Sequence, residues 1–229
     1  MCSQRTVDFT VCAGDLVCYG ANHNLVIHQI RQRNIPTVTG NYDTAVAWDL
    51  PYVSQTGSPQ PMESLQQAAL QWTRQYVLPK DRTYLQSLPW QLNYCLDGLR
   101  VTVLHAGLDR LDEELTPDQP ESLRQMACQL QADVVILGHT HIPFVYECVH
   151  HFGTTLFINA GSVGRAFDGD PRAAYAIFDT KSKTADLKRI DYNVEAASKA
   201  IAVSGMPHEI ADMVRLGLSY PQTLSFQSA

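Results

Sequence analysis

The chain has 229 residues, with 17 Lys and Arg against 23 Asp and Glu, a formal net charge of -6. Hydrophobic residues make up 45% of it, which excludes an intrinsically disordered protein. A chain of this size buries about 70–75% of its unfolded surface, enough for a core without disulfides. The acidic balance disfavours long nucleic acids, whose binding normally needs a basic face.

Neither a signal peptide nor a membrane-spanning segment is predicted. The segment Met1–Gly14 lacks a basic region followed by a long apolar run, and no run of about 18 apolar residues occurs. None of the six cysteines forms a Cys-x-x-Cys pair. We therefore expect reduced thiols in a cytoplasmic protein that does not bind membranes.

In the first half of the chain, short strands alternate with helices. The predicted strands run into polar turns, and Pro79 is expected to end the longest helix. The elements predicted in chain order are a strand at 7–13, a helix at 24–33, a strand at 35–39, a loop at 51–61, and helices at 65–76 and 81–88.

From Trp90 the hydrophobic period changes to two, and Asp97-Gly98 predicts a hairpin turn. The strands and helices that follow suggest an α+β fold of two packed mixed sheets flanked by helices. We expect one domain over residues 1–218 and a loose tail over 219–229. The remaining predicted elements are strands at 90–96, 101–105, 134–137, 144–148, 156–159, 174–178 and 185–192, and helices at 121–130, 194–203 and 209–216.

Four short segments each place a potential metal ligand just after a predicted strand. Strand ends on one edge of a sheet converge, so these ligands can meet in one cleft. Two imidazoles, a carboxylate and an amide oxygen suit a divalent ion such as Mn, Zn or Fe. The segments are Gly14-Asp15, Gly40-Asn41-Tyr42-Asp43, His105-Ala106-Gly107 and Gly138-His139-Thr140-His141.

Each segment alone also fits an ordinary turn or a satisfied polar residue, and the argument for a metal rests on their combination. On a regular strand, His139 and His141 cannot both reach one metal without a turn, but they can face two neighbouring metals. The remaining histidines match no ligand position and are interpreted as surface or loop residues. They are His23, His28, His150, His151 and His208.

With these motifs in this order, the chain resembles the calcineurin-like metallophosphoesterase superfamily, in its small bacterial phosphodiesterase-like branch. The segments Asn159–Arg165 and Asp168–Arg172 resemble a downstream signature of that branch. The resemblance covers nearly the whole chain. It implies a four-layer α/β/β/α sandwich and two adjacent metal ions that activate a water for attack on phosphorus.

The resemblance also implies roles for the ligands. Asp15 would bridge the two metals, Asn41, His105 and His139 would complete the second site, and His141 would belong to the first. Manganese is the expected metal, with Zn, Fe or Ni as alternatives, as one or two ions.

Four further residues take part in this interpretation. Tyr42 stands where many members of the superfamily have a general-acid His, which fits phosphodiesters or activated esters better than poor leaving groups. Asp43 would orient neighbouring groups by hydrogen bonding, or simply cap a turn. Ser162 and Arg165, in a Gly-rich loop, would bind the substrate phosphate, or form only a sheet-edge turn.

The first motif of the family, Asp-x-His, does not occur, because no Asp is followed two positions later by His. Only Met1–Thr6 precede the first predicted strand, too few for a strand and a crossover helix. We therefore expect the family's first strand and helix to be missing. Three explanations stay open: a longer true chain, a short form with one metal or a borrowed strand, or an inactive relative.

The functional prediction is a metal-dependent phosphoesterase that hydrolyses a phosphodiester or phosphomonoester, with its activity in question because of that absence. The alternative is a non-catalytic phosphate-ligand binding or regulatory module of the same fold. A small phosphate ester is the expected partner, and a homo-oligomer stays open. A nuclease is a third reading, in which Arg165 and Arg172 would hold a short nucleic acid.

Overall fold

The structure is a computed structural model that describes residues 7–51 and 60–220, without the side chains of residues 60 and 61. Most of the predicted loop at 51–61 and of the predicted tail at 219–229 therefore lies outside the described residues. Within the described part, no helix is long and apolar enough to cross a membrane.

The larger sheet has five strands in the order β1-β2-β3-β5-β4. Its central strands β2, β3 and β5 are mutually parallel, whereas both edge strands pair antiparallel to their neighbours. Asp97 and Gly98 both have positive φ, as a tight hairpin turn requires, so the predicted β1–β2 hairpin is confirmed. The strands are β1 (Gln91–Leu96), β2 (Leu99–Leu104), β3 (Val134–Leu137), β4 (Phe144–His150) and β5 (Gly153–Asn159).

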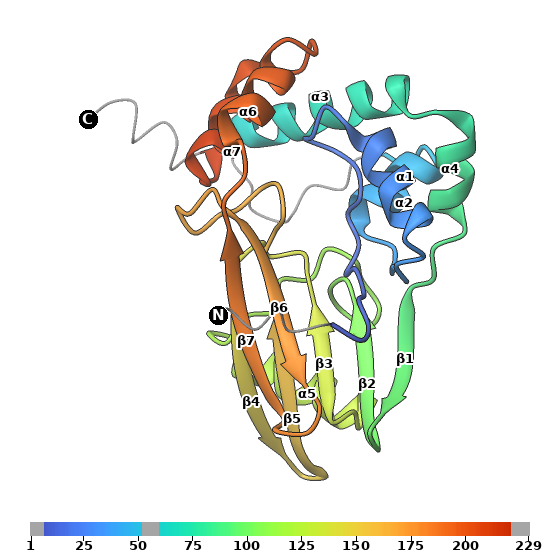
Figure 1. Ribbon diagram of the computed structural model, residues 1–229, viewed down its shortest axis with the longest axis vertical. Helices are drawn as coiled ribbons and strands as arrows, with labels where there is room; N and C mark the ends of the chain where they lie inside the picture. The colour runs from blue at the N-terminus through green and yellow to red at the C-terminus, as the bar shows by residue number, and fades with distance from the viewer. Residues whose placement is uncertain (1–6, 52–59, 221–229) are drawn as a thin grey trace.

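A second, antiparallel sheet of β6 (Ala173–Asp179) and β7 (Thr184–Ile190) lies in front of the first (Figure 1). Phe178 of β6 packs against the cluster of Val134 and Ile158 from the larger sheet. On the opposite face, helix α5 (Pro120–Leu130) covers the sheet. The predicted α+β architecture with two packed sheets is thus confirmed, and apolar burial on both faces of the larger sheet holds the layers together.

The other six helices gather at one end of the strands, near the carboxyl ends of β2 and β3 (Figure 1). Their shared core contains Ile27, Val46, Leu70, Leu85 and Ile210, each at most 2% exposed. The helices are α1 (His23–Gln32), α2 (Asn41–Ala47), α3 (Gln60–Tyr76), α4 (Pro79–Gln86), α6 (Val194–Ala202) and α7 (His208–Leu216).

Two predicted strands were wrong, and one helix was missed. The segments 7–13 and 35–39 are not strands but share a single parallel bridge between Cys12 and Thr37. Only two backbone hydrogen bonds join them, and Pro36 has no N–H to add a third. Helix α2 was missed, although Asp43, three residues after Gly40, accepts from the Gly40 backbone N–H and so forms one half of a capping box at its start.

Candidate metal centre

The predicted ligands come together where the parallel strands end. His105 directly follows β2, and His139 and His141 follow β3. Because β2 and β3 run parallel, these turns lie at the same edge of the sheet. The bridged segments around Cys12 and Thr37 bring Asp15 and Asn41 to the same place.

Close backbone approach fixes Asp15 against the start of α2. The backbone N–H of Tyr42 donates to Asp15 Oδ1 at 3.0 Å. A Cβ on Gly40 would lie 2.0 Å from Asp15 Oδ1 and 2.5 Å from the Asp15 backbone nitrogen. Only glycine fits at position 40, which explains the Gly-Asn pair of the motif in terms of space rather than of turn conformation.

The hydrogen bonds of His105 assign its tautomer. Its Nδ1 lies 2.7 Å from the carbonyl oxygen of Ala13, which can only accept, so Nδ1 carries the proton. The side chain is 2% exposed, and this burial lowers the pKa of His105 to about 4. At neutral pH the ring is uncharged and Nε2 presents a lone pair.

The lone pair of His105 faces other acceptors. Its Nε2 lies 3.0 Å from Asn41 Oδ1 and 3.4 Å from Asp15 Oδ2. Nδ1 of His139 lies 3.2 Å from the same Asn41 oxygen, and the ring of His139 also hydrogen-bonds the Asp112 backbone. With the Asn41 oxygen turned this way, carboxyl and amide oxygens and an unprotonated imidazole nitrogen meet as electron-pair donors, an arrangement that a cation among them stabilises.

This donor set fits a divalent metal ion. A carboxylate, an amide oxygen and two neutral imidazoles provide four ligands of borderline hardness. Counting only His, Cys, Asp and Glu, no group of three in the described residues is placed to hold a metal. The amide oxygen of Asn41 therefore completes the candidate centre, and it is the atom that both His105 and His139 face.

Burial sets the charge states of the centre. It raises the pKa of Asp15 to about 7, and backbone hydrogen bonds and the charge of Arg165 offset only part of that rise. Burial, followed by the neighbouring His105, lowers the pKa of His139 to about 3. Both effects disfavour charge in a desolvated place, and a bound cation would reverse the balance for the carboxylate.

His141 lies beside this group but has different partners. Its Nδ1 hydrogen-bonds the carbonyl oxygen of Arg165, and its ring stacks on Phe167 with centroids 4.7 Å apart. Both His139 and His141 have positive φ, at 64° and 59°. These left-handed residues supply the turn that the His-x-His spacing requires, at a cost in backbone strain of the kind found at functional sites.

Asp43 and Tyr42 have structural partners of their own. The Asp43 carboxylate is fully buried and accepts from the backbone N–H groups of Leu16 and Gly40 at 2.9 and 3.0 Å. It therefore holds the Asp15 segment against α2. The Tyr42 hydroxyl forms a short hydrogen bond with the Tyr19 hydroxyl, and burial raises the Tyr42 pKa well above its usual value.

The Gly-rich loop after β5 reaches the same place. The Arg165 backbone N–H donates to Ser162 Oγ at 3.0 Å, a local turn that leaves Ser162 partly exposed. The Arg165 guanidinium lies over the rings of Tyr19 and Phe167, 3.5 and 4.5 Å from their centroids. Arg165 is 7% exposed, and its Nε and Nη2 have no hydrogen-bond partner among the described residues.

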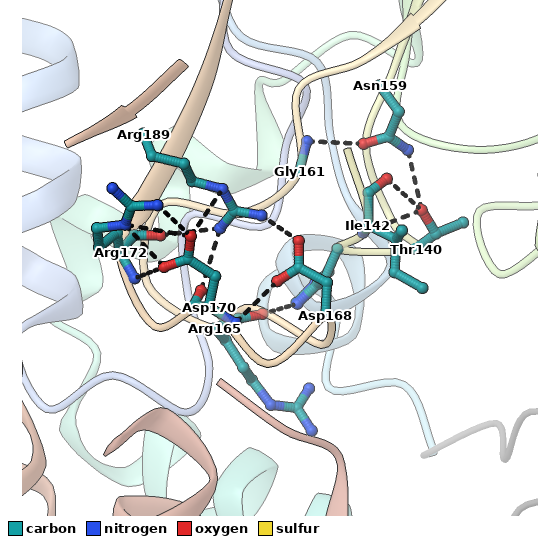
Figure 2. Close-up of polar contacts among 10 residues, drawn as sticks. Thr140, Ile142, Asn159, Gly161, Arg165, Asp168, Asp170, Arg172 and Arg189 are labelled. Carbon is teal, nitrogen blue, oxygen red and sulfur yellow. Dashed lines mark hydrogen bonds and ion pairs between the residues drawn. The ribbon is translucent and has the colours of Figure 1, made fainter. Parts of the chain in front are cut away.

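Three residues that sequence reasoning left without a role support this arrangement. Tyr19 and Phe167 flank Arg165, and Asn159 joins two loops. Asn159 is fully buried and donates to the carbonyl oxygen of Gly138 at 2.6 Å. It also accepts from the N–H of Gly161 (Figure 2). The sequence signal that could have found Asn159 is its place at the end of a predicted strand, where it begins the Asn159–Arg165 signature.

The second half of the signature, Asp168–Arg172, forms a separate surface network. Arg172 donates to both carboxylate oxygens of Asp170, and Arg189 pairs with Asp168 (Figure 2). Because Arg172 is ion-paired and Arg165 is buried, the two do not form an exposed basic cluster. The nuclease reading therefore gains no support from this pair.

Comparison with known proteins places these features in a family. The family model for the calcineurin-like phosphoesterase superfamily domain matches residues 2–183. The protein MJ0912 of Methanocaldococcus jannaschii is 30% identical over 228 residues, which cover 93% of this chain and 88% of that protein.

Two solved structures have the same fold. A metallophosphoesterase from Sphaerobacter thermophilus superposes with a TM-score of 0.75 at 24% identity, covering 93% of this chain and 90% of that one. Protein PH1004 from Pyrococcus horikoshii OT3 gives 0.72 at 18% identity, covering 89% and 83%. The chain belongs to the calcineurin-like phosphoesterase superfamily.

Proposed function

We propose that this protein is a metal-dependent phosphoesterase that hydrolyses a small phosphodiester or phosphomonoester. One observation carries the proposal: Asp15, Asn41, His105 and His139 direct a carboxyl oxygen, an amide oxygen and two imidazole nitrogens to one place, and the proton of His105 is held on Nδ1 by Ala13. Manganese is our first choice of metal, with Zn, Fe or Ni as alternatives. In this setting a divalent ion supplies Lewis-acid chemistry: it lowers the pKa of water and withdraws charge from phosphoryl oxygens.

Residues of the chain position the candidate ligands and the substrate phosphate. The bond from His105 Nδ1 to Ala13 holds the ring with its lone pair inward. Asp43 keeps Asp15 in register with α2 through its two backbone hydrogen bonds. Ser162 and Arg165 lie in the loop that would face the phosphate, next to His141.

Tyr42 limits the range of substrates. Its hydroxyl is committed to Tyr19 and keeps its proton at neutral pH because burial raises its pKa. A leaving alcohol would therefore receive little help from this position, which favours diesters and activated esters.

The five described cysteines are all free, which agrees with a reducing, cytoplasmic location.

The test is turnover of bis-p-nitrophenyl phosphate and p-nitrophenyl phosphate by metal-stripped protein after addition of Mn²⁺. We expect Mn²⁺-dependent release of nitrophenol, with the diester preferred. Asp15→Asn should abolish it, whereas His151→Ala, on the exposed β4–β5 turn, should leave it intact. If added metal produces no turnover while phosphate still raises the melting temperature, the protein is a binding module and the proposal is wrong.

A further inference from the structure

The side-chain nitrogens of Arg165 have different surroundings from those of three exposed arginines. Arg100, Arg110 and Arg172 each use Nε and Nη2 to grip a nearby carboxylate. In Arg165 the same two atoms are buried and have no hydrogen-bond partner among the described residues. Figure 2 shows its side chain turned away from the Asp168, Asp170, Arg172 and Arg189 network.

Aromatic rings, rather than a carboxylate, contact the positively charged guanidinium of Arg165. The guanidinium contacts the rings of Tyr19 and Phe167, and Phe167 in turn stacks on the ring of His141. Cation–π contacts stabilise a guanidinium without neutralising it. The positive charge therefore stays available beside the centre, because the ring of Tyr19 under the guanidinium hydrogen-bonds Tyr42, and the N–H of Tyr42 donates to Asp15.

The donors of the centre are sufficient for one ion. Asp15 Oδ1 accepts from the N–H of Tyr42, and Asp15 Oδ2 lies toward His105, which also faces Asn41 Oδ1. His141 lies on the side of Arg165, through its hydrogen bond to the Arg165 carbonyl and its contact with Phe167. Apart from Asp15, it is the only described residue expected to ligate a second ion there, and two protein ligands make a weak site.

We propose that the centre holds a single divalent cation and that the buried guanidinium of Arg165 provides the second positive charge beside it. This inference rests on the proposed function. A fixed arginine charge can stabilise phosphoryl oxygens in the transition state, as a second metal ion does in two-metal sites. Arg165 also repels the bound ion, so the two positive charges compete for Asp15.

The first experiment uses the unmodified chain, stripped of metal and titrated with Mn²⁺ by calorimetry and electron paramagnetic resonance. We expect one Mn²⁺ per chain and the six-line spectrum of an isolated ion. Two ions per chain with an exchange-coupled spectrum would overturn the inference and leave the proposed phosphoesterase function standing. No Mn²⁺ binding at all would contradict both.

The second experiment compares Arg165→Met, which removes the charge, with Arg165→Lys, which keeps it. Arg165→Met should bind Mn²⁺ about tenfold more tightly, because the repulsion is gone. It should also lose about 100-fold or more in turnover. Arg165→Lys should keep the wild-type Mn²⁺ affinity and recover part of the turnover.

The matched control is Arg100→Met, an exposed arginine paired with Asp133, which should change neither quantity. An Arg165→Met affinity equal to wild type would overturn the inference, because a merely structural arginine has no effect on the ion. Should Arg165→Met fail to fold, the wild-type stoichiometry and the lysine variant still decide.

Discussion

Arg165 and Arg172 belong to one loop and have opposite environments. Arg172 is exposed and doubly bonded to Asp170, while Arg165 is buried without a carboxylate in its fork. An exposed ion pair contributes little and can be replaced at little cost, whereas a buried charge without a partner is expensive. The expensive arrangement lies beside the candidate metal ligands, which is where strain and desolvation are expected to serve function.

The largest effect should come from a substitution in the candidate metal centre, next to buried Arg165. Gly40→Ala places a Cβ 2.5 Å from the backbone nitrogen of Asp15, so Asp15 and Asn41 must separate. We expect Mn²⁺-dependent turnover to fall by about 100-fold or more, because small displacements of reacting groups have effects of that size. Gly164→Ala, in the Arg165 loop, meets no atom within 4 Å and serves as the control. Equal activity of both variants would show that Asp15 tolerates displacement.

Asp43→Ala should have the next largest effect, on stability. It leaves the buried N–H groups of Leu16 and Gly40 without their acceptors. We expect a loss of about 2–4 kcal/mol in the free energy of unfolding, measured with urea on metal-free protein. Asp43→Asn keeps one acceptor oxygen and should lose less. A loss below about 0.5 kcal/mol for the alanine variant would refute the role assigned to Asp43.

A smaller loss is expected at the other end of α2. Arg82 donates to the carbonyl oxygen of Val46 at 2.8 Å and pairs with Asp49, at the C-terminus of the helix that begins with Asn41. Arg82→Met should lower the free energy of unfolding by about 1–2 kcal/mol in the same assay. Arg33→Met, which removes an exposed contact to Gln29, is the control and should be near neutral.

The surface network should give the smallest effect. The hydrogen bond from Arg172 lowers the pKa of Asp170 to about 2. The folded protein therefore favours ionised Asp170, and the resulting stability is present above about pH 4 and lost as the pH falls toward 2. Asp170→Asn should flatten the fall of melting temperature in that range slightly and leave turnover at pH 7 unchanged. A clear loss of turnover would show that this network contributes to the functional site.

Strong local patterns were sufficient for most of the fold. The hairpin at Asp97-Gly98 and the buried strand β3 follow from turn chemistry and an apolar run. The predictions failed where strand formation depends on a pairing partner. The segments 7–13 and 35–39 have strand-like sequences, yet they share only one bridge. Helix α2 was missed because it has only seven residues, and Arg82 of α4 stabilises its C-terminal end from outside.

The sequence alone determined the family, the α+β class and the identity of the metal-ligand candidates, because motif order and strand-end spacing are encoded locally. The tertiary structure decided the rest. It brought Asn41 between His105 and His139, assigned the lone pair of His105 through Ala13, and buried Arg165 between Tyr19 and Phe167. Hydrogen-bond partners, desolvation and the direction of a charge depend on residues distant in the chain, so only packing can specify them.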